Sequence, residues 1–282
     1  MGGSRTRAYG AAGRYDSNRR RAIRRRAAAY DDRAPVAARG TRRKERGRAF
    51  VKLTLAIETS GRFSSVAIAG PRGLIGEYGE EDGGRTENVQ RMIAGLFREH
   101  GREPGEIDGV AVSIGPGSFT GTRIGIAVAK GVALANACPL VGVPVPHALA
   151  TEADPEREYE VWLDVGRGEV YRTLVRGAST LVSGRTAPVD DYLAEDRGPD
   201  APRLIGSGAD RYRERIAERW PGCPVAETNA SQSRARTIAR IGRALLLAGE
   251  GGEWRGLEPL YARPADARLP KGRPAAPGKG AR

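Results

Sequence analysis

The chain has 282 residues and a formal charge of +13, from 47 lysines and arginines against 34 aspartates and glutamates. The excess lies in the tails, because residues 1–50 hold 16 basic and four acidic residues and the last twelve hold four basic and none acidic. The stretch from 51 to 270 keeps 27 basic against 30 acidic residues. The folded part of the chain therefore has no excess of positive charge. A basic folded surface that neutralises nucleic-acid phosphates is not the simplest interpretation of this composition.

The middle of the chain is long enough to bury the core of one large or two modest domains. Its two cysteines, Cys138 and Cys223, exclude a disulfide framework and suit a reducing compartment. The longest uncharged run, residues 131–150, contains three prolines, which indicates an interrupted core segment and not a membrane span. The amino terminus is rich in arginine and has no apolar stretch typical of a secretory signal. We therefore expect a cytoplasmic protein without membrane contact.

Residues 1–50 consist mainly of arginine, alanine and glycine without an apolar period of 2 or 3.6, which predicts disorder. Ordered sequence begins abruptly at Val51, so the favoured interpretation is a gene-start error, and we expect a chain starting there to fold. The alternatives are a nucleic-acid-binding arm and a transit peptide. The predicted division is an extension at 1–50, an amino-terminal lobe at 51–150, a carboxy-terminal lobe at 151–268 and a disordered basic tail at 269–282.

The first ordered segment predicts three strands, at 53–58, 64–69 and 74–79, joined by turns rich in glycine. A helix at 87–100 follows and ends at Gly101. Its apolar side chains recur at helical spacing and form one strong stripe. These side chains are Val89, Met92, Ile93, Leu96 and Phe97.

Next come an apolar strand at 109–114, a glycine-rich turn, a helix at 120–137 and a strand at 140–145. Three strands in a meander, then helix, strand, helix and strand, is the order of a ribonuclease-H-like unit, which is half of the two-lobed actin-like ATPase architecture. The predicted fold class is therefore α/β, with two such lobes of mixed sheet flanked by helices. Later elements are weaker: strands at 161–165, 169–175 and from 204 into a glycine turn, and helices at 190–195, 210–220 and 235–248.

The glycine-rich turn between the strand at 109–114 and the next helix is the most informative segment. Such a turn exposes backbone N–H groups at a helix amino terminus, which suits an anion. The alternative is that the glycines only let a strand turn sharply into a close-packed helix. The run is neither a Walker loop nor a dinucleotide fingerprint. The candidate nucleotide or anion site comprises Gly115, Gly117, Ser118, Thr120 and Gly121.

The sequence here resembles the TsaB family, which takes part in threonylcarbamoyladenosine modification of tRNA. The specific signal is the run Gly-Pro-Gly-Ser-Phe-Thr-Gly that begins at Gly115. The resemblance extends over roughly residues 51–268 and implies an actin-like fold. Further matching segments are 55–60, 163–171, 206–209 and 258–263.

TsaB is similar to TsaD, the metal-dependent catalytic subunit, which carries two histidine ligands just after the fifth strand. The resemblance places those two positions at Val145 and Leu149, and neither side chain can bind a metal. His147 lies between them, and a solitary imidazole is more often a structural residue than a ligand. The chain therefore resembles the branch without the catalytic metal.

Other polar residues have simpler interpretations. Glu58 ends the first strand, where actin-like ATPases place a phosphate- and metal-facing aspartate, but it has no visible partner in the sequence. Asp164 and Arg167 are expected to pair across a turn. Neither cysteine has the basic neighbours of a reactive thiolate. Four arginines are expected to form a solvated helix face, with tRNA contact as the alternative. They are Arg211, Arg213, Arg215 and Arg219.

The resemblance implies a non-catalytic subunit that pairs with and activates a TsaD-type subunit. With the ATPase TsaE, the pair transfers threonylcarbamoyl from its adenylate to an adenosine beside the tRNA anticodon. No catalytic residue, metal or cofactor of its own is expected, and ATP or ADP is placed at the subunit interface. The rivals are a stand-alone ATP-using phosphotransferase or glycoprotease-like hydrolase, which the missing metal ligands disfavour, and a tRNA-binding adaptor that acts through its tail.

The family's pairs are expected to assemble through the two helices of the amino-terminal lobe. We therefore expect a homodimer in isolation, because an unpartnered apolar stripe would be exposed. The alternative is that Met92 and Leu96 are plain core. The predicted partner interface comprises Val89, Met92, Ile93, Leu96, Ile124 and Val128.

Overall fold

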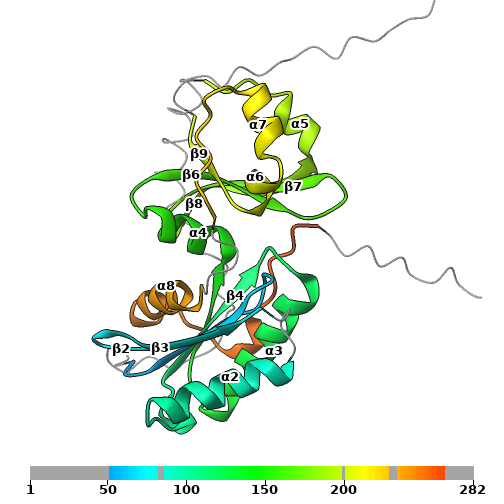
Figure 1. Cartoon of the computed structure of the whole chain (residues 1–282). Coiled ribbons are helices and arrows are strands. Elements are labelled where there is room, and N and C mark those ends of the chain that lie inside the picture. The colour runs from blue at the N-terminus through cyan, green and yellow to red at the C-terminus, as the bar shows by residue number, and fades with distance from the viewer. Residues whose placement is uncertain (1–50, 82–85, 199–200, 229–233, 264–282) are drawn as a thin grey trace, which may run out of the picture.

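The computed structural model describes residues 51–81, 86–198, 201–228 and 234–263, and Figure 1 shows that they form two α/β lobes, one above the other. The predictions for residues 1–50 and 269–282 lie outside the described residues. Within the described part, no helix is both long and apolar enough to cross a membrane.

The first lobe is built on a five-stranded sheet with the strand order β3-β2-β1-β4-β5. β1 pairs antiparallel with β2 and parallel with β4, so Ile57 lies between Val66 and Val112. This is the predicted order of a meander followed by parallel strands, and it confirms the ribonuclease-H-like unit. The strands are β1 (Thr54–Glu58), β2 (Ser64–Gly70), β3 (Gly73–Glu80), β4 (Gly109–Gly115) and β5 (Leu140–Pro144).

Helices cover both faces of this sheet (Figure 1). The side chains of each central strand alternate between the faces, since successive strand residues point to opposite sides. Large side chains such as Leu55 and Ile57 pack toward α2 (Thr86–Glu99) and α3 (Phe119–Ala135). Small ones, Ala56, Ala67 and Ala111, pack toward α8 (Ala235–Leu247). The small side chains let α8 approach closely, and a Cβ added at Gly242 would lie 2.2 Å from Ala111 Cβ.

The apolar stripe of α2 is buried inside the first lobe, which corrects the predicted partner interface. Val89, Met92 and Leu96 are at most 1% exposed, and Ile93 is 8% exposed. Ile124 and Val128 of α3 are half-buried against the same core. The alternative interpretation, that Met92 and Leu96 are plain core, therefore holds. On these two helices, a partner protein can reach only the sides that point away from the sheet.

The second lobe contains a four-stranded sheet with the strand order β8-β7-β6-β9. Its core is aromatic, with Trp162 packed 5.7 Å from Tyr192 and 6.2 Å from Trp220, measured between ring centroids. The edge strand β8 is mostly exposed and has no regular apolar alternation, which is why the sequence did not indicate it. The strands are β6 (Glu158–Asp164), β7 (Glu169–Arg176), β8 (Ser179–Pro188) and β9 (Arg203–Ile205).

Short helices complete the second lobe. The helix expected at 210–220 is divided at Tyr212, whose backbone leaves helical geometry with φ −105° and ψ 21°. The helices are α5 (Val189–Leu193), α6 (Ser207–Arg211) and α7 (Arg213–Arg219). Outside this lobe, α4 (Val145–Ala153) lies between the two sheets, and the 3₁₀ turns η1 (Pro104–Glu106) and η2 (Trp254–Gly256) belong to the first lobe.

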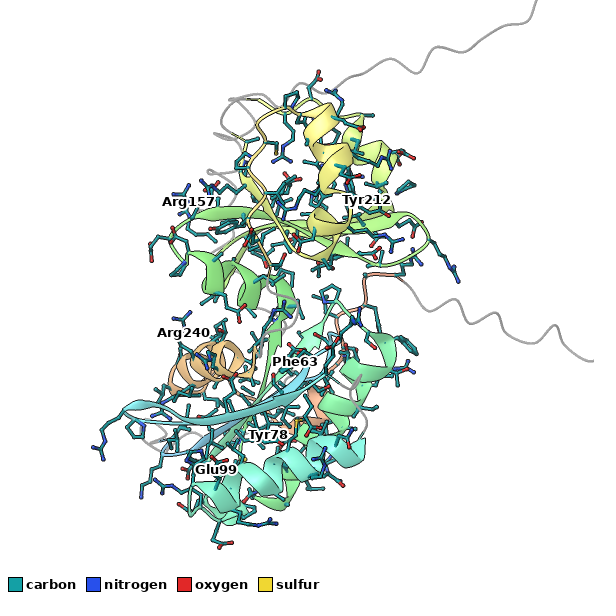
Figure 2. All side chains as sticks on the ribbon, in the orientation of Figure 1. Phe63, Tyr78, Glu99, Arg157, Tyr212 and Arg240 are labelled. Atoms are coloured by element: carbon teal, nitrogen blue, oxygen red, sulfur yellow. The ribbon has the colours of Figure 1, made fainter. Side chains whose placement is uncertain are left out.

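After α7 the chain leaves the second lobe, which differs from the expected extent of that lobe, residues 151–268. Helix α8 returns to the sheet of the first lobe, and η2 packs against α3. α4 lies between the lobes and contacts β5, β6, β7 and α8. Arg240 of α8 donates a 3.1 Å hydrogen bond to the carbonyl of Thr151 on α4 (Figure 2). The two lobes are therefore joined by helix packing as well as by covalent connection.

We expect Leu96→Ala to lower the free energy of unfolding by about 2–5 kcal/mol, because it leaves a cavity under the sheet of the first lobe. Arg98→Ala, on the exposed side of the same helix, should change it by less than about 0.5 kcal/mol. Urea unfolding followed by circular dichroism measures both. Equal stability of the two variants would contradict the buried position of the stripe.

Candidate functional site

The glycine-rich loop lies where β4 runs into α3. Its backbone is held by protein groups: the N–H of Ser118 donates to the carbonyl of Ser60 at 2.7 Å. Ser118 is also the residue that caps α3, because its hydroxyl accepts from the N–H of Gly121 at 3.2 Å. The helix amino terminus is therefore capped from within the loop.

The glycines of this loop are required by a close approach to the end of β1. A Cβ at Gly117 would lie 2.4 Å from the carbonyl oxygen of Ser60, and one at Gly121 would lie 2.1 Å from that of Thr59. One turn later, a Cβ at Gly125 would meet the Thr59 hydroxyl at 2.2 Å. No side chain fits at these distances. Close packing, the alternative weighed for these glycines, therefore accounts for their positions.

The residues of the candidate anion site differ in their exposure to solvent. Gly115 is buried with φ +92°, a conformation that favours glycine, while Gly117, Ser118 and Thr120 are exposed. Two of the N–H groups that an anion would need, those of Ser118 and Gly121, already have protein acceptors. The anion-binding role of this loop stays a prediction.

Glu58 at the end of β1 is almost completely buried, with 1% exposure. Its Oε1 accepts from both the N–H and the hydroxyl of Ser60 at 2.5 Å, so the carboxylate orders the turn that packs on the glycine loop. Its Oε2 has no hydrogen-bond partner among the described residues, and neither has the hydroxyl of Ser113 on the neighbouring β4. A buried carboxylate at this point opposes the binding of a phosphate nearby.

A second carboxylate and an arginine lie close to Glu58. Glu152 of α4 is 3.6 Å from Nε of Arg234, which immediately precedes α8. Burial raises the pKa of Glu152, the charge of Arg234 lowers it, and the negative charges of Glu58 and Glu77 raise it further. Burial is the largest of these influences, and the attraction of Arg234 exceeds the repulsion from either glutamate.

The two positions that carry metal ligands in the TsaD pattern hold packing residues in this chain. Val145 and Leu149, on α4, are 6% and 3% exposed and belong to a core cluster with the second sheet. His147 lies between them and makes a 2.7 Å hydrogen bond between Nε2 and the hydroxyl of Thr180 on β8. Burial lowers the pKa of His147 to about 4. The described residues contain no group of three or more histidine, cysteine or acidic side chains able to hold a metal.

Comparisons with known proteins identify relatives of this chain. The family model "TsaD: tRNA N6-adenosine threonylcarbamoyltransferase" matches residues 84–195. The tRNA threonylcarbamoyladenosine biosynthesis protein TsaB of Haemophilus influenzae is 30% identical over 193 residues, which cover 62% of this chain and 80% of that protein. The chain belongs to the TsaB family.

Two further relatives define the extent of the likeness. TsaB of Escherichia coli is 31% identical over 120 residues, 42% of this chain, and the match spans only about half, 52%, of that protein. The solved structure of YeaZ from Pseudomonas aeruginosa has a TM-score of 0.62 and 25% identity, and it covers 74% of this chain and 99% of YeaZ. Both lobes therefore share the fold of this family.

The segment after η2 that resembles the family links the two lobes. The N–H of Leu260 donates to the carbonyl of Ile114 on β4 at 2.7 Å, and the hydroxyl of Thr186 on β8 donates to the carbonyl of Ala262 at 2.6 Å. Arg263 then pairs with Glu169 at the start of β7. Residues 258–263, called the strap below, are thus fixed to both sheets. Local sequence patterns could not predict the position of this segment, because its hydrogen bonds and ion pair are made to residues far away in the chain.

The strap brings Tyr261 beside two residues of α3, Phe119 and Arg123, that the sequence did not single out as a group. The Phe119 and Tyr261 rings lie 5.5 Å apart between centroids, with Arg123 against both. The only sequence signal was indirect, since the segments that contain them are the ones that resemble the family.

The polar residues of the second lobe are paired on the surface. Asp164 accepts from the N–H of Gly166 at 3.0 Å and from Arg211 at 2.6 Å, so its partner across the lobe is Arg211. Arg167 lies in the same turn with φ +58°. The other arginines of the cluster pair with aspartates: Arg213 with Asp210, Arg215 with Asp190, and Arg219 with Asp196. These pairs fit the predicted solvated face.

Neither cysteine has the environment of a reactive thiolate. Burial raises the pKa of Cys138 to about 11. Burial is also the largest influence on Cys223, whose pKa is raised despite the positive charge of Arg197. Both thiols therefore stay protonated at neutral pH.

We expect Gly121→Ala to lower the free energy of unfolding by about 1–3 kcal/mol, because its Cβ collides with the Thr59 carbonyl. Gly95→Ala is the matched control within a helix, since a Cβ there has no atom within 4 Å. The control should raise stability by about 0.5–1 kcal/mol through helix propensity. Thermal unfolding of both variants tests this, and a Gly121→Ala protein as stable as wild type would show that the loop does not pack as described.

Protonation of His147 should make stability depend on pH. Its pKa is about 4 when folded against an ordinary 6.5, so below pH 6.5 the unfolded chain binds a proton that the folded chain does not. Stability should therefore fall as the pH drops from about 6.5 to 4, by up to about 1.4 kcal/mol per pH unit. His147→Gln should remove this part of the slope. Urea unfolding at pH 7, 6 and 5 provides the comparison, and equal slopes would count against a buried neutral imidazole.

Proposed function

We propose that this chain is the non-catalytic subunit that pairs with and activates a TsaD-type subunit in threonylcarbamoyladenosine modification of tRNA. The observation that carries the proposal is membership of the TsaB family together with apolar, buried Val145 and Leu149 at the positions of the metal ligands. A TsaD-type partner supplies the metal site that these residues cannot form.

The surface left free by the first lobe supports a pairing role. With the α2 stripe buried, α3 still presents a row of exposed small and apolar residues one turn apart. Ala127 and Gly131 are exposed, and Leu134 is 58% exposed. Small side chains let the backbone of a partner helix approach closely, and an exposed leucine gains from being covered. These three residues are called the α3 outer stripe.

The proposal includes the other members of the assembly. The chain forms a homodimer through the α3 outer stripe when its partner is absent, and it acts on tRNA only within the complex. ATP or ADP is bound at the subunit interface together with a TsaE-type ATPase. The described part of this chain places the buried acidic side chain of Glu58 beside the turn that packs on the glycine loop, which supports placing the nucleotide mainly on the partner.

The pairing is tested by copurification with the TsaD homologue of the same genome. We expect Ala127→Glu to abolish it, because a charge placed in the seam costs about 2–4 kcal/mol of binding. Ala244→Glu is the matched control, an exposed alanine in the last turn of α8 on the opposite face of the sheet. Circular dichroism confirms that both variants are folded.

A folded Ala127→Glu protein that still copurifies fully would place the partner elsewhere. Reconstitution tests the activating role: supplied with threonylcarbamoyl adenylate, the TsaD homologue should modify tRNA only when this chain and the ATPase are added. This chain alone should not hydrolyse ATP above background. Sustained ATP hydrolysis by the purified chain would instead favour an enzyme in its own right.

A further inference from the structure

The side chain of Arg123 is held rigidly on the surface by two aromatic residues. Its guanidinium carbon lies 3.6 Å from the centroid of the Phe119 ring, and its Nε donates to the hydroxyl of Tyr261 at 2.9 Å. Both rings are substantially exposed, Phe119 at 51% and Tyr261 at 41%. Stacking and hydrogen bonding thus fix an arginine that would otherwise be free to rotate in solvent.

The support for this arrangement comes from the tertiary structure. Phe119 begins α3 directly after its cap, Ser118, and Tyr261 is carried by the strap. The strap is anchored on either side of Tyr261, by the bond from Leu260 to Ile114 and by the bond from Thr186 to Ala262. Arg123 is therefore positioned by two elements that are themselves fixed to the sheets.

The charge of Arg123 is not neutralised within the described residues, where no carboxylate lies within ion-pair distance of it. The exposed arginines of α7 differ, since Arg213, Arg215 and Arg219 each pair with an aspartate. Among the residues that the structure describes, Arg123 uses only its Nε in a hydrogen bond, which leaves the two terminal amino groups to donate outward. Two parallel N–H donors in one plane match the two oxygens of a carboxylate.

The surroundings favour a protein carboxylate over a free phosphate. The rim of the cluster is apolar and exposed, formed by Phe119, Tyr261 and Leu260, which is 37% exposed. Arginine with aromatic neighbours is the composition of energetic centres in protein interfaces. Phosphate sites usually gather several cations, and the next one along α3 is Lys130, seven residues away. The cluster also continues the α3 outer stripe, one turn before Ala127.

We propose that Arg123, clamped by Phe119 and Tyr261, is a preformed receptor for an aspartate or glutamate side chain of the partner subunit and anchors the amino-terminal end of the α3 seam. This inference rests on the proposed pairing with a TsaD-type subunit. Because the arginine is already ordered, pairing loses little side-chain entropy there. Because the strap is bonded to both sheets, Tyr261 is held in position beside Arg123.

The test measures binding of the full chain to the TsaD homologue by isothermal titration calorimetry. Arg123→Gln should weaken binding at least about 30-fold, since it leaves the partner carboxylate unpaired in the interface. Arg123→Lys should recover only part of this, because an ammonium makes no planar fork. Tyr261→Phe, which keeps the ring and removes the hydroxyl, should fall between wild type and Arg123→Gln. Arg215→Gln, a paired and exposed arginine of α7, should bind like wild type.

Two further measurements identify the group that Arg123 binds. Treatment of the complex of the R123K variant with a carbodiimide should join its amine to a partner carboxylate through a new amide, and mass spectrometry of the linked peptides then names that residue. Inorganic phosphate at 50 mM should leave wild-type binding unchanged. Competition by phosphate would instead make the cluster a phosphate site and overturn the proposal.

The outcomes separate this inference from the function it rests on. If Ala127→Glu abolishes binding while a folded Arg123→Gln protein binds at full strength, the pairing stands and the receptor is wrong. If wild type does not bind the TsaD homologue at all, both are wrong. If Arg123→Gln and Arg215→Gln both weaken binding about 30-fold, the effect is a general one of charge, and the proposal that Arg123 is a receptor is wrong.

Discussion

The close approach between the β4–α3 loop and the end of β1 is the constraint on which the rest of the first lobe depends. Gly117 and Gly121 let the loop backbone come within contact of the Thr59 and Ser60 carbonyls, where no side chain fits. Glu58 orders the opposing turn by accepting both hydrogen bonds of Ser60. This contact sets where α3 starts, and therefore where Phe119 and Arg123 lie on the surface.

The same contact gives the glycine-rich motif a structural explanation. A strand, a glycine turn and a helix together resemble an anion site, because a helix amino terminus exposes N–H groups. Here the turn closes on its own protein neighbours, and the buried carboxylate of Glu58 orders the turn that faces it. The positions of its glycines are thus explained by packing, while an anion-binding role of the loop stays a prediction.

The two lobes use different physical means to hold together. In the first, small side chains such as Ala111 and Gly242 let α8 pack against the sheet from the far end of the sequence. In the second, the aromatic core around Trp162 includes a buried ion pair between Arg197 and Glu160, and the Trp162 indole donates to the same carboxylate at 2.7 Å. The strap then ties the sheets to each other, which gives a long-range reason for a segment whose sequence has no local structure.

The sequence by itself determined the order of the elements in the first lobe and the family, because periodicity and turn residues act over short distances. Through the family resemblance, it also placed the apolar residues Val145 and Leu149 at the two positions where TsaD carries histidine ligands. It did not determine which apolar residues face a partner: an amphipathic stripe such as that of Met92 and Leu96 looks the same whether a sheet or another subunit covers it. Only the tertiary structure decided this, by placing the stripe under the sheet, and only it brought Tyr261 to Arg123, since contacts between residues 138 apart leave no periodic trace in the chain.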